Sequence, residues 1–64
     1  MVKINGKDLP LVNTRLDLYL ADSGYDSKRV AVECNGCIVP KAQYGTTILR
    51  DGDTVEIVSF VGGG

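Results

Sequence analysis

The sequence contains no histidine and no tryptophan, and it has only two cysteines. Histidine is the side chain that most often serves as a general base near neutral pH and as a metal ligand. A chain without histidine has few ways to build a catalytic centre of its own. The 7 basic and 8 acidic residues give a net charge of -1, which disfavours nucleic-acid binding because that function needs a clustered basic face.

Long apolar runs are also missing. No segment approaches the ~18 apolar residues that a membrane-spanning helix needs, and residues 1–6 lack the basic and apolar regions of a secretory signal. These features predict a cytoplasmic protein. The chain of 64 residues is expected to form one domain, and a domain of this size buries only about 60% of the surface that its unfolded chain exposes. Such a thin core leaves little room for a buried catalytic pocket.

Short strands are predicted wherever apolar and polar residues alternate. The dipeptides Asn5-Gly6 and Asn35-Gly36 favour tight hairpin turns, because both residues tolerate positive φ angles. Pro10 cannot donate a ladder hydrogen bond, so the second strand should lie at a sheet edge. The expected strands cover residues 2–5, 7–12, 29–34, 37–39, 46–49 and 54–60.

One amphipathic helix is expected over residues 15–22, where apolar residues recur at spacings of three and four. Asn13 or Thr14 is predicted to cap its first turn, and Gly24 to end it in the left-handed conformation. A further helical turn is expected at residues 40–44, with Tyr44 pointing inward. The predicted core comprises Leu16, Tyr19, Leu20, Val30, Val32, Val55 and Ile57.

Cys34 and Cys37 flank the second turn in a C-x-x-C pattern. A structural zinc site needs four ligands, so two thiols without histidine do not predict a zinc site within the chain. Facing residues of such a hairpin have Cα atoms about 5.5 Å apart, which permits a disulfide only with strain. Cys34 is therefore interpreted as a small hydrophobic residue at the core edge, and Cys37 as a partly exposed thiol.

The last predicted strand should expose large apolar side chains. Val58 and Phe60 alternate with the inward-facing residues, and Val61 follows them. Glu33 on a neighbouring strand is expected to add a charge at the rim, whereas Glu56 is interpreted as part of a solvated face. Scattered exposed apolar residues are normal on any protein surface. Their position beside the chain end nevertheless favours a partner-binding surface.

The sequence closes with Gly62, Gly63 and Gly64. Glycines have no side chain to pack and the highest backbone entropy, so we expect a domain at residues 1–60 and a flexible tail at 61–64. A tail of this width could thread a narrow channel and deliver the α-carboxylate of Gly64 to the active site of another protein. A frayed end or a cloning scar is the alternative that composition alone leaves open.

Taken together, these features resemble the ThiS family of sulfur carriers in thiamine biosynthesis. The resemblance covers nearly the whole chain and implies an α+β, ubiquitin-like β-grasp fold. In that fold a mixed sheet packs on one helix in the order ββαββ(β), and the last strand runs through the middle of the sheet. The segments that carry the resemblance are Arg29-Val-Ala-Val-Glu33, Asn35-Gly36, Ile38-Val-Pro40, Asp51-Gly-Asp53, Val55-Glu-Ile57 and Val61-Gly-Gly-Gly64.

The resemblance also implies the chemistry. An E1-like adenylating enzyme of the ThiF type would use ATP and Mg²⁺ to activate the carboxylate of Gly64. A sulfur donor protein would then convert it to a thiocarboxylate, which a thiazole synthase of the ThiG type would use. Gly63 and Gly64 match the glycine pair of the family, and Gly62 matches a position that is often glycine. The chain itself would bind no cofactor and would be a protein cosubstrate rather than an enzyme.

Other functions would use the same tail. A ubiquitin-like modifier is joined to lysines through its terminal carboxylate, and related carriers supply sulfur for molybdopterin synthesis or tRNA thiolation. In each case a poor acyl donor, the carboxylate, must first become a mixed anhydride with a good leaving group. The sequence alone leaves these alternatives open.

Overall fold

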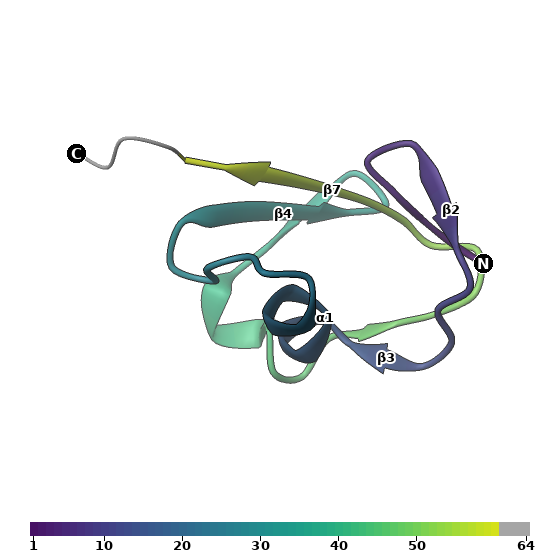
Figure 1. Ribbon diagram of the computed structural model, residues 1–64, viewed down its shortest axis with the longest axis horizontal. Helices are drawn as coiled ribbons and strands as arrows, with labels where there is room; N and C mark the ends of the chain where they lie inside the picture. Colours follow the sequence, from purple (N-terminus) through teal and green to yellow (C-terminus); the bar gives the residue numbers. More distant parts are fainter. Residues whose placement is uncertain (61–64) are drawn as a thin grey trace.

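The computed structural model describes residues 1–60, which form a mixed sheet packed on one helix (Figure 1). The main sheet has five strands in the order β2-β1-β7-β4-β5. The last strand, β7 (Thr54–Ser59), lies at its centre, parallel to β1 (Val2–Ile4) and antiparallel to β4 (Val30–Cys34). The edges are β2 (Lys7–Leu9) and β5 (Cys37–Val39). The predicted fold, with its last strand in the middle, is confirmed.

Both predicted hairpin turns are present. The φ angles are 51° at Asn5 and 82° at Gly6, and 53° at Asn35 and 84° at Gly36. Two successive positive φ angles define the tight turn whose twist matches that of the flanking strands. The two Asn-Gly dipeptides therefore fix the register of β1 with β2 and of β4 with β5.

A second sheet of two short strands was not predicted. β3 (Thr14–Arg15) pairs antiparallel with β6 (Ile48–Leu49). The strand expected at residues 7–12 ends at Leu9, so the prediction that it reaches Val12 is wrong. The N–H of Leu11 donates back to the carbonyl of Leu9 at 2.8 Å, and Asn13 has a φ of 51°. This bend carries the chain away from the main sheet and into β3.

The helix α1 (Leu16–Asp22) begins without a side-chain cap, so the prediction of Asn13 or Thr14 as its cap is wrong. Its cap residue is Arg15. The first N–H groups of a helix need partners outside it, and here the segment just before β6 supplies them. The N–H of Leu16 donates to the carbonyl of Thr47 at 2.8 Å, and that of Asp17 donates to the carbonyl of Tyr44 at 3.1 Å. At the other end Gly24 has a φ of 83°, as predicted.

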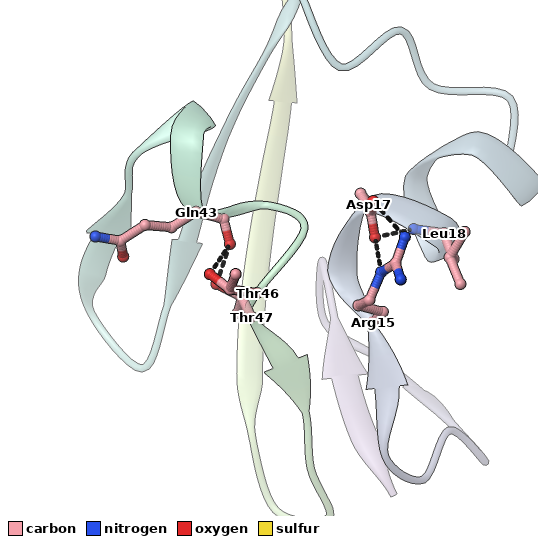
Figure 2. Close-up of polar contacts among 6 residues, drawn as sticks. All are labelled: Arg15, Asp17, Leu18, Gln43, Thr46 and Thr47. Carbon is pink, nitrogen blue, oxygen red and sulfur yellow. Dashed lines mark hydrogen bonds and ion pairs between the residues drawn. The ribbon is translucent and has the colours of Figure 1, made fainter.

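Figure 2 shows how side chains reinforce this start. The guanidinium of Arg15 donates to both carboxylate oxygens of Asp17, at 2.7 and 2.9 Å, and Asp17 accepts the N–H of Leu18 at 2.8 Å. The bonds from Arg15 lower the pKa of Asp17. Nearby, the hydroxyls of Thr46 and Thr47 donate to the carbonyl of Gln43, which closes the short helix η1 (Lys41–Gln43).

The core lies between the inner face of the sheet and α1. Tyr44 points inward as predicted, but Tyr19 is only half-buried and packs against the rim of the core, so its prediction as a core residue is wrong. No polar or charged residue is buried within residues 1–60, and no helix in that range is long and apolar enough to cross a membrane. The buried residues are Val2, Ile4, Leu16, Leu20, Val30, Val32, Tyr44, Leu49, Val55 and Ile57.

Candidate functional site

The candidate site lies where β7 leaves the sheet. The chain emerges from the buried centre of the domain, and the N–H of Phe60 donates to the carbonyl of Arg29 at 2.7 Å. This bond holds the end of the strand against the residue that precedes β4. Residues Val61, Gly62, Gly63 and Gly64 lie outside the described part of the chain, so the predicted tail and its site residues remain predictions.

An apolar patch covers the outer face of the sheet beside this exit. Val58 is 58% exposed, Phe60 57% and Ile38 66%, which confirms that Val58 and Phe60 point outward. Ala31 on β4 lies directly opposite Val58. We call Ala31, Ile38, Val58 and Phe60 the outer patch. Contiguous apolar surface of this kind marks protein interaction sites.

A hollow deepens one side of the outer patch. Its volume is about 220 Å³, and it opens where β5 ends and Pro40 turns the chain away from β4. Ala31, Ile38 and Phe60 contribute to its lining together with Pro40 and Lys41. The ammonium of Lys41 is already bound, because it donates to the carbonyls of Val30 and Ser27. The hollow is therefore suited to an apolar side chain of a partner.

Two carboxylates border the outer patch. Glu33 on β4 lies directly opposite Glu56 on β7, and neither forms an ion pair with any residue in the range 1–60. Like charges in facing positions of a sheet are destabilising. Charged groups left unpaired beside an apolar patch guide the approach of an oppositely charged partner. Glu33 and Glu56 are both exposed, as expected, and the role of Glu33 as a rim charge stays a prediction. Sequence reasoning missed that the two carboxylates face each other, because only the strand register reveals the pair.

The two cysteines lie far from this exit. Cys34 and Cys37 face each other across the β4–β5 turn, and Cys34 also faces Val55 near the start of β7. Both are free thiols, one partly buried and one exposed. Burial raises the pKa of the Cys34 thiol, with a smaller contribution from Asp53. They therefore lie at the opposite end of the sheet from the outer patch.

The two thiols should differ in reactivity. The thiolate is the reactive form, so the raised pKa and partial burial of Cys34 should make its alkylation at pH 8 several-fold slower than that of Cys37. Peptide mapping by mass spectrometry after timed iodoacetamide treatment measures both rates. Equal rates in the native protein would contradict the burial of Cys34, and unfolding in urea should remove the difference.

A larger hollow of about 550 Å³ lies against α1, lined in part by Leu11, Leu18 and Tyr19. Among residues 1–60, Asp22 is the only charged residue that lines it, so this part of the chain offers no acid–base pair there. Among residues 1–60 no three cysteine or acidic side chains lie close enough together to hold a metal ion. The outer patch and the exit of β7 are therefore the stronger candidate.

A mixed sheet with a central last strand, packed on a single helix, defines the ubiquitin-like β-grasp class. A crystal structure of the thiamine biosynthesis protein ThiS from Geobacter metallireducens is similar to this chain, with a TM-score of 0.77 and 28% sequence identity. The similarity covers 98% of this chain and 97% of that one.

Sequence comparison gives the family. The model of the ThiS family matches residues 1–64, and the chain belongs to this family. It is 43% identical to the sulfur carrier protein ThiS of Bacillus subtilis (strain 168), over the full length of both. It is also 44% identical over 62 residues to a thiazole synthase of Paramagnetospirillum magneticum, but spans only 19% of that protein's length.

Proposed function

We propose that the chain is a sulfur carrier whose reactive group is the C-terminal carboxylate of Gly64. That carboxylate is adenylated, converted to a thiocarboxylate, and supplies sulfur to a thiazole synthase for the thiamine thiazole ring. The observation that carries the proposal is the position of β7. This central strand runs past the outer patch and leads directly into Val61 and the three glycines.

In this proposal the terminal carboxylate undergoes the chemistry, and the domain at residues 1–60 binds the partner. The carboxylate attacks the α-phosphorus of ATP and releases pyrophosphate, and a sulfur nucleophile then displaces AMP from the acyl carbon. Neither step requires a base from the carrier, which agrees with the absence of histidine. The domain at residues 1–60 holds the outer patch against the partner, so that the carboxylate can enter the partner's active site.

The proposed partners follow from this chemistry. An E1-like adenylating enzyme of the ThiF type binds the ATP and Mg²⁺, a sulfur donor protein supplies the sulfur, and a thiazole synthase of the ThiG type accepts it. A thiazole synthase partner is supported by the relative of that name, which contains a segment similar to this chain. The unpaired carboxylates of Glu33 and Glu56 favour a partner surface with basic residues beside an apolar side chain.

The expected result is a change in mass at the chain end. Incubation with the adenylating enzyme, ATP, Mg²⁺ and a sulfur donor should yield a chain about 16 mass units heavier, because sulfur replaces one carboxylate oxygen. Addition of a thiazole synthase with its small-molecule substrates should return the original mass. Intact-protein mass spectrometry measures both steps, and omission of ATP is the control.

Different products would point to other functions. Covalent conjugates with lysines of other proteins would indicate a ubiquitin-like modifier. A thiocarboxylate that a thiazole synthase leaves unchanged, but that a molybdopterin or tRNA-thiolating enzyme consumes, would move the carrier to another pathway. A chain that keeps its original mass with the complete loading system would contradict the proposal.

A further inference from the structure

β7 has unequal neighbours on its two sides. β4 pairs with it from Val55 to Ser59, whereas β1 pairs only with Thr54 and Val55. In Figure 1 the yellow end of β7 continues past the β1–β2 hairpin with β4 beside it. One side of the strand therefore loses its partner before the strand ends.

The side chain of Asn5 closes part of this gap. The N–H of Ile57 donates to the Asn5 amide oxygen at 2.7 Å, and the Asn5 amide nitrogen donates to the carbonyl of Ile57 at 3.2 Å. The backbone N–H of Asn5 donates to the carbonyl of Val55 at 2.9 Å. The amide group of Asn5 thus takes the place that the next residue of a longer β1 would occupy, and the ladder stops there.

After Ile57, Ser59 is the next residue of β7 whose backbone N–H and carbonyl point toward the side of β1. The N–H of Phe60 donates toward β4, so in the antiparallel ladder the backbone groups of the preceding residue point away from β4. Ser59 is exposed, and within residues 1–60 its N–H and carbonyl have no backbone partner. An exposed strand edge of this kind is a template for pairing with another chain.

We propose that a strand of the adenylating enzyme pairs, main chain to main chain, with the open edge of β7 at Ser59. This inference rests on the proposed function, because an enzyme that acts on Gly64 must surround the residues just before it. The open edge is continuous with the outer patch through Val58 and Phe60. Addition of a strand to an exposed edge is a recurring mode of peptide recognition.

Main-chain pairing also suits the residues that follow. Three consecutive glycines offer a partner only backbone N–H and carbonyl groups, and hydrogen bonds to those groups do not depend on side chains. A second copy of the chain is a poorer occupant. Within residues 1–60, two copies paired through this edge would each offer only the backbone groups of Ser59, because Asn5 already covers those of Ile57. The pairing gives the enzyme a fixed register on the strand, while the outer patch contributes apolar contact.

Ser59→Pro tests the open edge directly. Proline removes one N–H and places its ring at that edge, and within sheets it is tolerated where the N–H faces solvent. The ladder to β4 uses the backbone groups of Val58 and Phe60, so the variant should unfold cooperatively near the wild-type temperature. Its Kd for the adenylating enzyme, measured by calorimetry, should rise about tenfold or more through the lost hydrogen bond and the added ring.

Asp8→Pro is the matched control. Lys7 and Ile4 flank the two-residue turn and form a hydrogen-bonded pair, so the N–H of Asp8 points away from β1, toward solvent, on the edge strand β2. This variant should keep both the fold and the wild-type Kd. Equal affinity for wild type and Ser59→Pro would overturn the strand pairing alone, whereas no binding by the wild type would overturn the proposed function as well.

Hydrogen exchange keeps the test valid if Ser59→Pro fails to fold. In the free wild-type chain the amide of Ser59 should exchange faster than those of Ile57 and Phe60, whose N–H groups are bonded. Addition of the adenylating enzyme should slow the exchange at Ser59. Unchanged exchange in the complex would overturn the proposal, as would protection that appears without the enzyme and grows with chain concentration, which would assign the edge to a second copy.

Discussion

Ile57→Asp is expected to unfold the domain. Ile57 is 6% exposed and points into the core from the central strand. Aspartate removes that apolar contact and places a carboxylate among residues that include no buried polar or charged group within the range 1–60. The combined cost is several kcal/mol, comparable with the roughly 3 to 10 kcal/mol that stabilises a domain of about this length. Thermal unfolding followed by circular dichroism should show no cooperative transition.

Val58→Asp is the matched control, because it introduces the same side chain one residue further along β7. Val58 is 58% exposed on the outer face, so its carboxylate remains in water and the cooperative transition should persist. A cooperative transition in Ile57→Asp at the wild-type temperature would contradict the burial of Ile57. Loss of the transition in both variants would show that neither face of the strand tolerates a charge.

Local turn chemistry explains most of what the sequence predicted about the fold. Asn5-Gly6 and Asn35-Gly36 adopt the positive φ angles expected of them, and each sets the register of a hairpin. Strict alternation in β7 identified Val55 and Ile57 as inward-facing. These signals depend only on neighbouring residues, so they can be interpreted before the tertiary structure is known.

The features that were missed depend on contacts between distant segments. β3 has only two residues, too few for an alternating pattern to identify it, and although a strand was expected at residues 46–49, its pairing with β3 was not. The start of α1 is satisfied by the carbonyls of Thr47 and Tyr44, so no capping side chain is needed before Leu16. These interactions join residues 27 to 35 positions apart in the sequence, and no local propensity indicates them.

The features of the candidate site also divide into those that local sequence predicts and those that depend on contacts between distant segments. Val58, Phe60 and Glu33 could be predicted because alternation places them on the outer face. The pairing of Glu33 with Glu56 could not, because it follows from the register between β4 and β7. The sequence pattern also could not indicate that the backbone groups of Ser59 lack a partner, because this depends on where β1 ends and on the side chain of Asn5.

Removal of Gly64 should abolish adenylation while leaving the fold intact. The buried core residues all fall within positions 2–57 of the described part of the chain. The shortened chain should therefore unfold at the wild-type temperature and still dock through the outer patch. Its carboxylate would fall one residue, at most about 3.3 to 3.6 Å, short of the nucleotide. Because a displacement of about 1 Å can cost 10²-fold in rate, ATP–pyrophosphate exchange with the adenylating enzyme should fall by at least about 100-fold.

Phe60→Ala provides the contrast, because it removes apolar contact from the outer patch without moving the carboxylate along the chain. Loss of an aromatic contact of this kind should raise the KM for the carrier about tenfold and leave kcat near the wild-type value. Removal of Gly64 should do the reverse, with kcat lost and binding retained in calorimetry. If the chain without Gly64 supported exchange at the wild-type rate, the terminal carboxylate could not be the reactive group, and the carrier function proposed for this chain would be wrong.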